Sequence, residues 1–168
     1  MHHGDCFGLL GVNGAGKTTT FRMLTGDEIR SSGNAFTSFC NLENSRKQFL
    51  SSIGYCPQFD GIVGVLTGKE MLELFCRLRG VDSANIHSVA MSWLGKLGLT
   101  ASADVQCRKY SGGMKRRLST AMALIGEPPI VLLDESTSGV DPMARRQFWK
   151  VITSVRDSGQ AVILTSHR

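Results

Sequence analysis

One short segment constrains this 168-residue chain more than any other. Residues 11–18 read GVNGAGKT and fit the pattern G-x-x-x-x-G-K-[ST] in full. An apolar run at 6–10 precedes the segment and helix-forming residues follow from Lys17 to Leu24, which indicates a strand, a loop and a helix. In that context the glycines let backbone N–H groups and a helix N-terminus face phosphate oxygens. The segment predicts a phosphate-binding loop, and the alternative is a glycine-rich turn that only caps a helix.

The residues of this loop have separate expected roles. We expect the ammonium of Lys17 at the β and γ phosphates of a nucleotide, and the hydroxyl of Thr18 as a ligand of Mg²⁺. The predicted nucleotide contacts from the loop are Asn13, Gly14, Gly16, Lys17, Thr18 and Thr19.

The rest of the chain alternates between apolar runs and helical patterns. Residues 53–56, 130–133 and 161–164 have strand length, and the last two are continuous apolar runs that are typical of parallel sheets covered on both faces. A capping box at 67–70 opens one helical stripe that ends at Gly80, and a second stripe ends at Gly98. Asp141 and Pro142 have the pattern of an N-cap and first residue of a later helix. The fold class predicted is α/β, a P-loop NTPase core with a mainly parallel sheet and an inserted helical subdomain.

Length and composition favour a single soluble domain. The chain is 42% hydrophobic and 20% charged, close to the globular average, and it is too short for two ordinary domains. We divide it into a P-loop core, 1–66 and 127–168, and a helical subdomain, 67–126. No apolar stretch is long enough to cross a bilayer, and the start lacks a signal peptide, so this segment is expected to face the cytosol.

Cysteines and charge exclude other classes of site. The five cysteines form no C-x-x-C pair, which argues against a zinc or redox motif and favours buried free thiols. The formal charge of +5 is scattered except at 115–117, so we expect phosphate binding and a solvated surface rather than a nucleic-acid partner.

A second motif places acids beside the loop. The apolar run at 130–133 ends in Asp134 and Glu135. The carboxyl end of a parallel strand next to a phosphate loop is where nucleotide-bound Mg²⁺ needs a carboxylate, and we assign that role to Asp134. Glu135 would then face the γ-phosphate and orient or deprotonate the attacking water. The alternative interpretation makes both acids strand-end caps.

Residues 110–119 read YSGGMKRRLS and narrow the choice among the many classes of P-loop protein. Here the sequence resembles the ABC ATPases, whose signature serine and glycines open a helix that meets the γ-phosphate of ATP on a partner domain. A hydroxyl and bare N–H groups at a helix start suit an anion. The resemblance assigns this contact to Ser111, Gly112 and Gly113, and ATP and Mg²⁺ are the cofactors it implies.

Three further residues follow in the order that this family shows. Gln58 matches the Q-loop glutamine, which reaches Mg²⁺ or water and couples to the membrane domain. Asp141 matches the D-loop aspartate, which works across the dimer, and His167 matches the switch histidine at the γ-phosphate. Taken singly they are a surface amide, a helix cap and a strand-end histidine. The resemblance makes Glu135, His167 and Gln58 the catalytic residues, and Thr18, Gln58 and Asp134 the metal ligands.

Finer similarity, over nearly the whole chain, is to the second nucleotide-binding domain of subfamily A transporters. It implies a head-to-tail partner domain, transmembrane domains, and work at the cytoplasmic face of a membrane on phospholipid or sterol-like substrates. Two residues depart from the family pattern, Ser136 in place of proline and Met114 in place of glutamine. The adenine-stacking aromatic and the segment after the switch histidine are not in this sequence, so we expect a domain truncated at both ends with little ATPase activity alone.

The function predicted is ATP binding and hydrolysis that powers transmembrane transport. The first alternative is a non-catalytic ATP-binding fragment or regulatory module, favoured by Ser136 and the missing ends. A second alternative is a soluble ABC ATPase of DNA repair or translation. The DNA-repair type requires a long coiled coil, and no sustained heptad repeat lies between Lys17 and Ser111.

Overall fold

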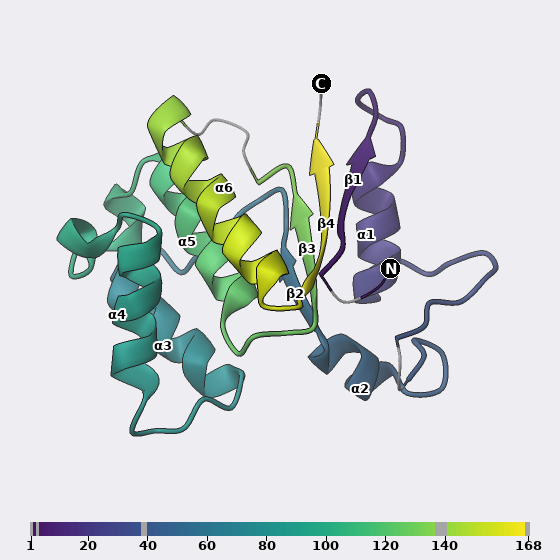
Figure 1. Cartoon of the computed structure of the whole chain (residues 1–168), viewed down its shortest axis with the longest axis horizontal. Coiled ribbons are helices and arrows are strands. Elements are labelled where there is room, and N and C mark those ends of the chain that lie inside the picture. Colours follow the sequence, from purple (N-terminus) through teal and green to yellow (C-terminus); the bar gives the residue numbers. More distant parts are fainter. Residues whose placement is uncertain (1, 3, 38–39, 137–140, 167–168) are drawn as a thin grey trace.

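The structure is a computed structural model that describes residues 2, 4–37, 40–136 and 141–166. Its centre is a parallel sheet with the strand order β1-β4-β3-β2 (Figure 1). The strands are β1 (Cys6–Leu10), β2 (Ile53–Cys56), β3 (Ile130–Asp134) and β4 (Ala161–Ser166). The predicted α/β fold with a parallel sheet is confirmed.

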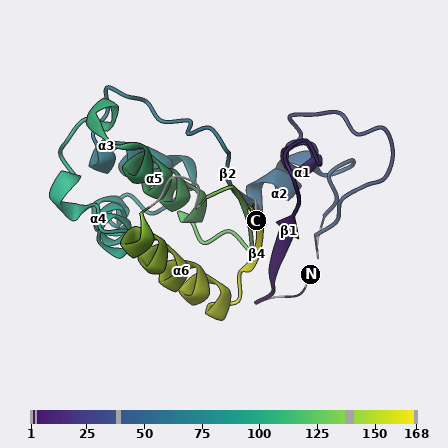
Figure 2. The same cartoon turned by 90° about the horizontal axis from the view of Figure 1, so that it is seen from above.

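Helices cover both faces of this sheet. The helices are α1 (Lys17–Thr25), α2 (Arg46–Ser51), α3 (Gly68–Leu78), α4 (Ile86–Lys96), α5 (Gly112–Leu124) and α6 (Pro142–Asp157). Seen from above, α1 and α2 lie on one side of the strands and α3 to α6 on the other (Figure 2). The division into a core and a helical subdomain at 67–126 stays a prediction.

Strand β3 shows why its sequence is an unbroken apolar run. Val131 and Leu133 belong to the core cluster that includes α5 and α6, whereas Leu132 packs with Phe21 of α1 and Phe49 of α2. Successive side chains of a strand point to opposite faces. A strand with helices on both faces therefore needs apolar residues at every position.

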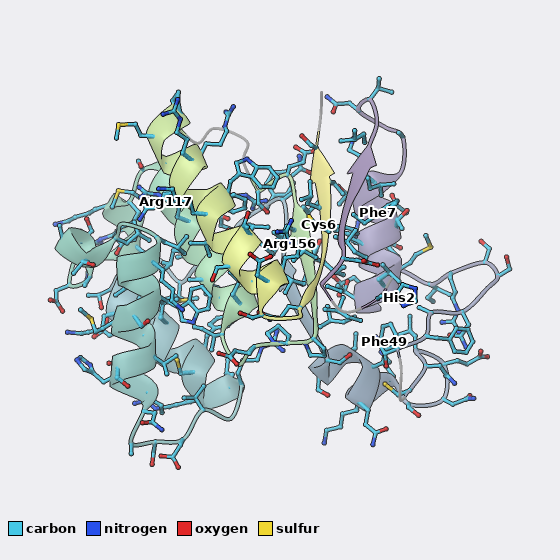
Figure 3. The ribbon with its side chains drawn as sticks, viewed as in Figure 1. His2, Cys6, Phe7, Phe49, Arg117 and Arg156 are labelled. Atoms are coloured by element: carbon cyan, nitrogen blue, oxygen red, sulfur yellow. The ribbon has the colours of Figure 1, made fainter. Side chains whose placement is uncertain are left out.

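Strand β1 forms one edge of the sheet and differs from β3. Its Phe7 and Leu10 are 53% and 67% exposed, and Cys6 is also exposed. Figure 3 labels Cys6 and Phe7 on this strand. The expectation of buried thiols is therefore wrong for Cys6, which lies on the edge strand, and for Cys40, which is half-buried. It holds for Cys56, Cys76 and Cys107, which are buried.

Local sequence signals place several helix ends correctly. Thr67 and Glu70 form the predicted capping box at α3, and Asp141 caps α6 with Pro142 at its first position. Helix α2 was not predicted from the sequence, because it has six residues and its N-cap, Ser45, makes no side-chain capping bond. Among the described residues, no helix combines the length and apolar character needed to cross a membrane.

Candidate functional site

The glycine-rich loop joins β1 to α1 through left-handed backbone positions. Gly14 and Gly16 have φ angles of 81° and 88°, which side chains of L residues rarely adopt. Gly16 is the N-cap of α1, and the first turn of that helix carries no acidic residue. The loop therefore presents a helix N-terminus that favours an anion.

The side chain of Lys17 folds back against its own loop. The residue is 6% exposed, and its Nζ donates to the carbonyl oxygens of Gly11 at 2.7 Å and Val12 at 3.0 Å. These bonds hold the ammonium beside the backbone that forms the cradle.

The loop lines a cavity of about 520 Å³ together with two residues from distant parts of the sequence. Gln58 follows β2 and Glu135 follows β3, and both were predicted for this site from sequence. The residues that line the cavity are Asn13, Gly14, Ala15, Gly16, Lys17, Thr18, Thr19, Gln58 and Glu135. The parallel strand order produces this meeting, because the loops at the carboxyl ends of the strands lie at one edge of the sheet.

Asp134 is the last residue of β3 and is fully buried. One carboxylate oxygen accepts a hydrogen bond from the Thr165 hydroxyl, and the other, Oδ2, has no hydrogen-bond partner among the described residues. A buried carboxylate oxygen without a partner is costly, and a hard cation would satisfy it. The residue therefore fits the predicted role of Mg²⁺ ligand.

Tyr55 of β2 is an uncharged neighbour of Asp134. Burial, together with the negative charge of Asp134, raises the pKa of Tyr55 to about 12. The phenol therefore stays protonated at physiological pH and adds no charge to the site.

Glu135 has an unusual backbone. Its φ is 51°, in the left-handed region, which costs a residue with a side chain about 1–3 kcal/mol. Its N–H donates to Thr165 Oγ1 at 3.0 Å, and its Oε2 accepts from Gln58 Nε2 at 3.1 Å. Strain of this kind gathers at functional sites, and Glu135 lines the cavity together with the loop.

Thr165 of β4 is a site residue that the sequence analysis missed. It contacts Asp134 at the end of β3 and Glu135, which follows it, because Asp134 and Thr165 are paired in the parallel register. The apolar run predicts a strand that ends at 164, one residue before Thr165. A polar residue that continues a strand next to one ending in two acids is the signal that could have identified it.

The other predicted residues do not line this cavity. Ser111 and Asp141 are exposed N-caps, and their side-chain oxygens accept from Met114 N at 3.3 Å and Ala144 N at 2.9 Å. The bond from Ala144 N–H is the main cause of the lowered pKa of Asp141. Gly112 and Gly113 form the first turn of α5. His167 lies outside the described residues.

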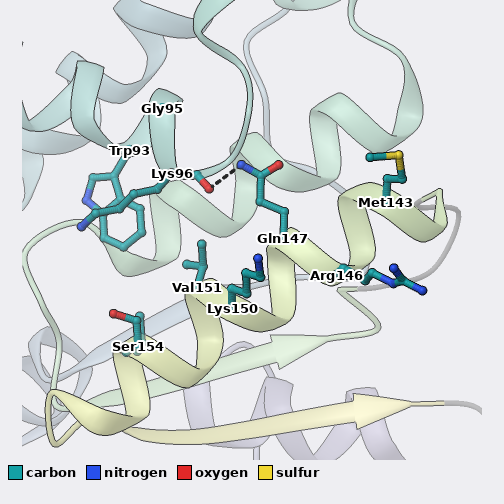
Figure 4. A pocket seen from close by; sticks show the side chains of 10 residues that line it. Trp93, Gly95, Lys96, Met143, Arg146, Gln147, Lys150, Val151 and Ser154 are labelled. Atoms are coloured by element: carbon teal, nitrogen blue, oxygen red, sulfur yellow. Dashed lines mark hydrogen bonds between the residues drawn. The ribbon is translucent and has the colours of Figure 1, made fainter.

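A separate cavity of about 710 Å³ lies between α4 and α6 (Figure 4). Gln147 crosses it and donates to the carbonyl oxygen of Lys96 at 3.0 Å, beside Trp93. It shares no lining residue with the cavity at the loop.

Comparisons with known proteins agree with this arrangement. Residues 1–138 match the family model described as ABC transporter. The chain is 56% identical over 164 residues to human (Homo sapiens) retinal-specific phospholipid-transporting ATPase ABCA4, covering 98% of this chain and 7% of that protein. It is 55% identical over 164 residues to mouse (Mus musculus) ATP-binding cassette sub-family A member 7, covering 98% and 8%. It is 49% identical over 167 residues to human phospholipid-transporting ATPase ABCA3, covering 99% and 10%.

Two solved structures share the fold. One is described as the ATP-binding subunit of an ABC transporter, with a TM-score of 0.89 and 25% identity over 99% of this chain and 69% of that chain. The other is a dimeric post-hydrolysis state of the ATP-binding cassette MJ0796 with ADP and Pi, with a TM-score of 0.88 and 21% identity over 99% and 76%. The chain spans a tenth or less of the length of the three sub-family A relatives.

Proposed function

The chain belongs to the ABC transporter family, as predicted from its motifs, and we propose that it binds Mg·ATP and hydrolyses it as an ATP-binding domain of a transporter. One observation carries the proposal. Lys17, Gln58 and Glu135 line a single cavity, and at the end of β3 the buried Asp134 has a carboxylate oxygen without a partner among the described residues. A cation, an amide and a carboxylate beside a glycine-rich loop form a set suited to phosphoryl transfer.

Binding would rest on the loop. The N–H groups at the start of α1 and the Lys17 ammonium would hold the β and γ phosphates, with Asn13, Gly14, Gly16 and Thr19 lining the cradle. Thr18, Asp134 and Gln58 would hold Mg²⁺, which when bound neutralises charge on the phosphate oxygens. The partnerless Oδ2 of Asp134 supports this assignment.

Hydrolysis would use Glu135 as the base. Its carboxylate would orient a water and accept a proton as the water oxygen forms a bond to the γ-phosphorus and the bond to the β-phosphate oxygen breaks, releasing ADP and phosphate. Gln58 already donates to this carboxylate and would help to place the water. We assign His167 to the γ-phosphate by the family resemblance alone.

The exposed motifs would serve a second domain. We propose that Ser111, Gly112, Gly113 and Asp141 close over ATP held by a head-to-tail partner domain, with Ser111 and the first turn of α5 facing the γ-phosphate. In this proposal the helical segment 67–126 is the subdomain that moves with transmembrane domains at the cytoplasmic face of a membrane. Two of the relatives are named phospholipid-transporting ATPases, which supports lipids as the transported class.

The test is Mg²⁺-dependent ATP binding, followed by turnover. Calorimetry on the purified chain should show that Mg²⁺ strengthens ATP binding over EDTA and that Asp134→Asn removes most of this gain. Phosphate release should be low for the chain alone and should rise when a complete ABC domain is added. Absence of ATP binding would refute the proposal, and binding without turnover beside an active partner would select the non-catalytic module.

A further inference from the structure

Arg116 is a buried cation in the second turn of α5. The residue is 5% exposed, and its guanidinium contacts two separate parts of the site. Nη1 donates to the carbonyl oxygens of Pro57 and Gln58, the latter at 3.4 Å, and to Asp60 Oδ1 at 3.2 Å. Nη2 donates to the carbonyl oxygen of Asp134. One side chain therefore joins α5 to the segment after β2 and to the end of β3.

We propose that Arg116 is a positioning residue for ATP hydrolysis, which ties the placing of Gln58 and Asp134 to the helix that begins at Ser111. The inference rests on the proposed function and extends it. Gln58 follows β2 and Asp134 ends β3, and the carbonyl oxygens of both residues accept from this one guanidinium. A shift of α5 when Ser111 meets a partner would therefore reach the metal and water residues of this chain's own site.

The chemistry of arginine suits this task. The planar guanidinium has five donors in a fixed fork, so it can serve acceptors that lie in different directions, whereas the lysine ammonium acts as a compact point charge. The Asp60 carboxylate at 3.2 Å partly compensates the buried charge. Helix α5 packs against both β2 and β3, so the fork projects from a well-supported element.

Arg117 provides a matched control on the same helix. Its guanidinium also donates to backbone carbonyl oxygens, those of Leu97 at 2.8 Å, Gly98 at 3.4 Å and Gly113 at 3.3 Å. Arg117 contacts neither Gln58 nor Asp134 among its described bonds. Because Arg117 is half-buried and Arg116 is buried, the stability of each variant is measured by chemical unfolding, and an effect of Arg116→Lys on the site that exceeds its loss of stability reports positioning.

The first readout needs no nucleotide. In ¹⁵N-labelled full chain, the side-chain amide resonances of Gln58 report its bond to Glu135, and Gln58→Ala assigns them. Arg116→Lys should shift or broaden these resonances, and Arg117→Lys should leave them in place. If the lysine variant folds poorly, Arg116→Gln replaces it. This variant also removes the charge and should have the same effect. Unchanged Gln58 resonances in folded Arg116 variants would overturn the proposal.

The second readout is a double-mutant cycle in Mg·ATP binding by the same chain. Arg116→Lys should raise the Mg²⁺ concentration for half-maximal ATP binding about tenfold in the parent chain, and much less in the Gln58→Ala background. The effect of Arg117→Lys should be small in both. Equal effects of Arg116→Lys in the two backgrounds would show that it does not act through Gln58. If the parent chain binds no Mg·ATP, the proposed function fails, whereas the resonance test still decides whether Arg116 places Gln58.

Discussion

The two sets of motif residues in this chain differ in how much of their environment the chain itself supplies. At the loop, Lys17, Asp134 and Glu135 are 6%, 0% and 9% exposed. Lys17 bonds to the backbone of its own loop, and the two acids bond to Thr165 of the neighbouring strand. At the starts of α5 and α6, Ser111 and Asp141 are exposed and bond only within their own helix among the bonds described. The first set is assembled by folding, whereas the second presents helix ends at the surface.

This difference has a physical origin. The acids follow a central strand, so burial on both faces and pairing with β4 fix them as the sheet forms. An N-cap needs only the N–H groups of its own first turn and can therefore stand at the surface without a partner. We infer that the loop set carries affinity by itself, and that the helix-end set acts only on a second molecule.

The largest effect is expected from Lys17→Ala. The loss of charged hydrogen bonds to two phosphates, about 1.5–3 kcal/mol each, should weaken ATP binding at least 100-fold and abolish turnover. Calorimetry on the purified chain measures the affinity. Lys47→Ala on the exposed face of α2 is the control and should bind like the parent. Unchanged affinity in Lys17→Ala would remove the loop from the nucleotide site.

Glu135→Gln should separate binding from hydrolysis. The amide keeps the shape of the side chain but is no base, so turnover should fall about 10²–10⁴-fold while ATP still binds. Phosphate release from the chain paired with a complete ABC domain gives the rate.

The matched control for this change is Glu127→Gln. Glu127 is exposed and is the other residue with a side chain and a positive φ among those described, at 49°. The Glu127→Gln variant should hydrolyse ATP at the parent rate. A Glu135→Gln variant with the parent rate would place the base elsewhere and would weaken the contrast between the two sets.

The sequence predicted the elements well where one physical rule dominates. Continuous apolar runs located the two inner strands, β3 and β4, and capping chemistry located the starts of α3 and α6. Helix α2 carried no such signal. The exposure of β1 could not be predicted in this way, because β1 and β2 are both edge strands and only β2 is largely buried, and the strand order is not readable from an apolar run.

The candidate site was predicted by residue type and not by contact. Motif spacing brought Lys17, Gln58 and Glu135 into one hypothesis, and the structure places them around one cavity. Thr165 lies in no motif, and Arg116 lies in the signature run without a role assigned to it from sequence, because their roles arise from strand register and from the packing of α5 on the sheet. Register and buried bonds between distant segments are tertiary properties that a single sequence does not display.

Ser111→Ala tests the helix-end set. Loss of the N-cap should destabilise the chain by about 0.5–2 kcal/mol, measured by chemical unfolding, and ATP binding by the isolated chain should not change. Turnover with a partner domain should fall. Thr67→Ala removes the N-cap of α3 and is the matched control, with a similar loss of stability and no loss of turnover. Weaker ATP binding by the isolated Ser111→Ala chain would contradict the division into two sets.

The smallest effect is expected at Ser136, where the family pattern has proline. The side chain is 4% exposed, and its hydroxyl has no hydrogen-bond partner among the described residues. Ser136→Pro removes this unpaired group and restricts the unfolded chain, which together favour stabilisation by about 0.4–1 kcal/mol. A proline also restricts the residue before it, and Glu135 has a φ of 51°, so part of the gain should be lost.

We therefore expect Ser136→Pro to be neutral or mildly stabilising, within about 1 kcal/mol, in a thermal melt. Ser136→Ala separates the two contributions, because it removes the hydroxyl without restricting the backbone. Equal gains in both variants would assign the effect to the hydroxyl, and a gain in the proline variant alone would assign it to the chain entropy. A loss of several kcal/mol in Ser136→Pro alone would mean that the left-handed backbone of Glu135 cannot precede proline. In that case the serine is what allows this chain to hold Glu135, its proposed base, in the conformation found at the loop cavity.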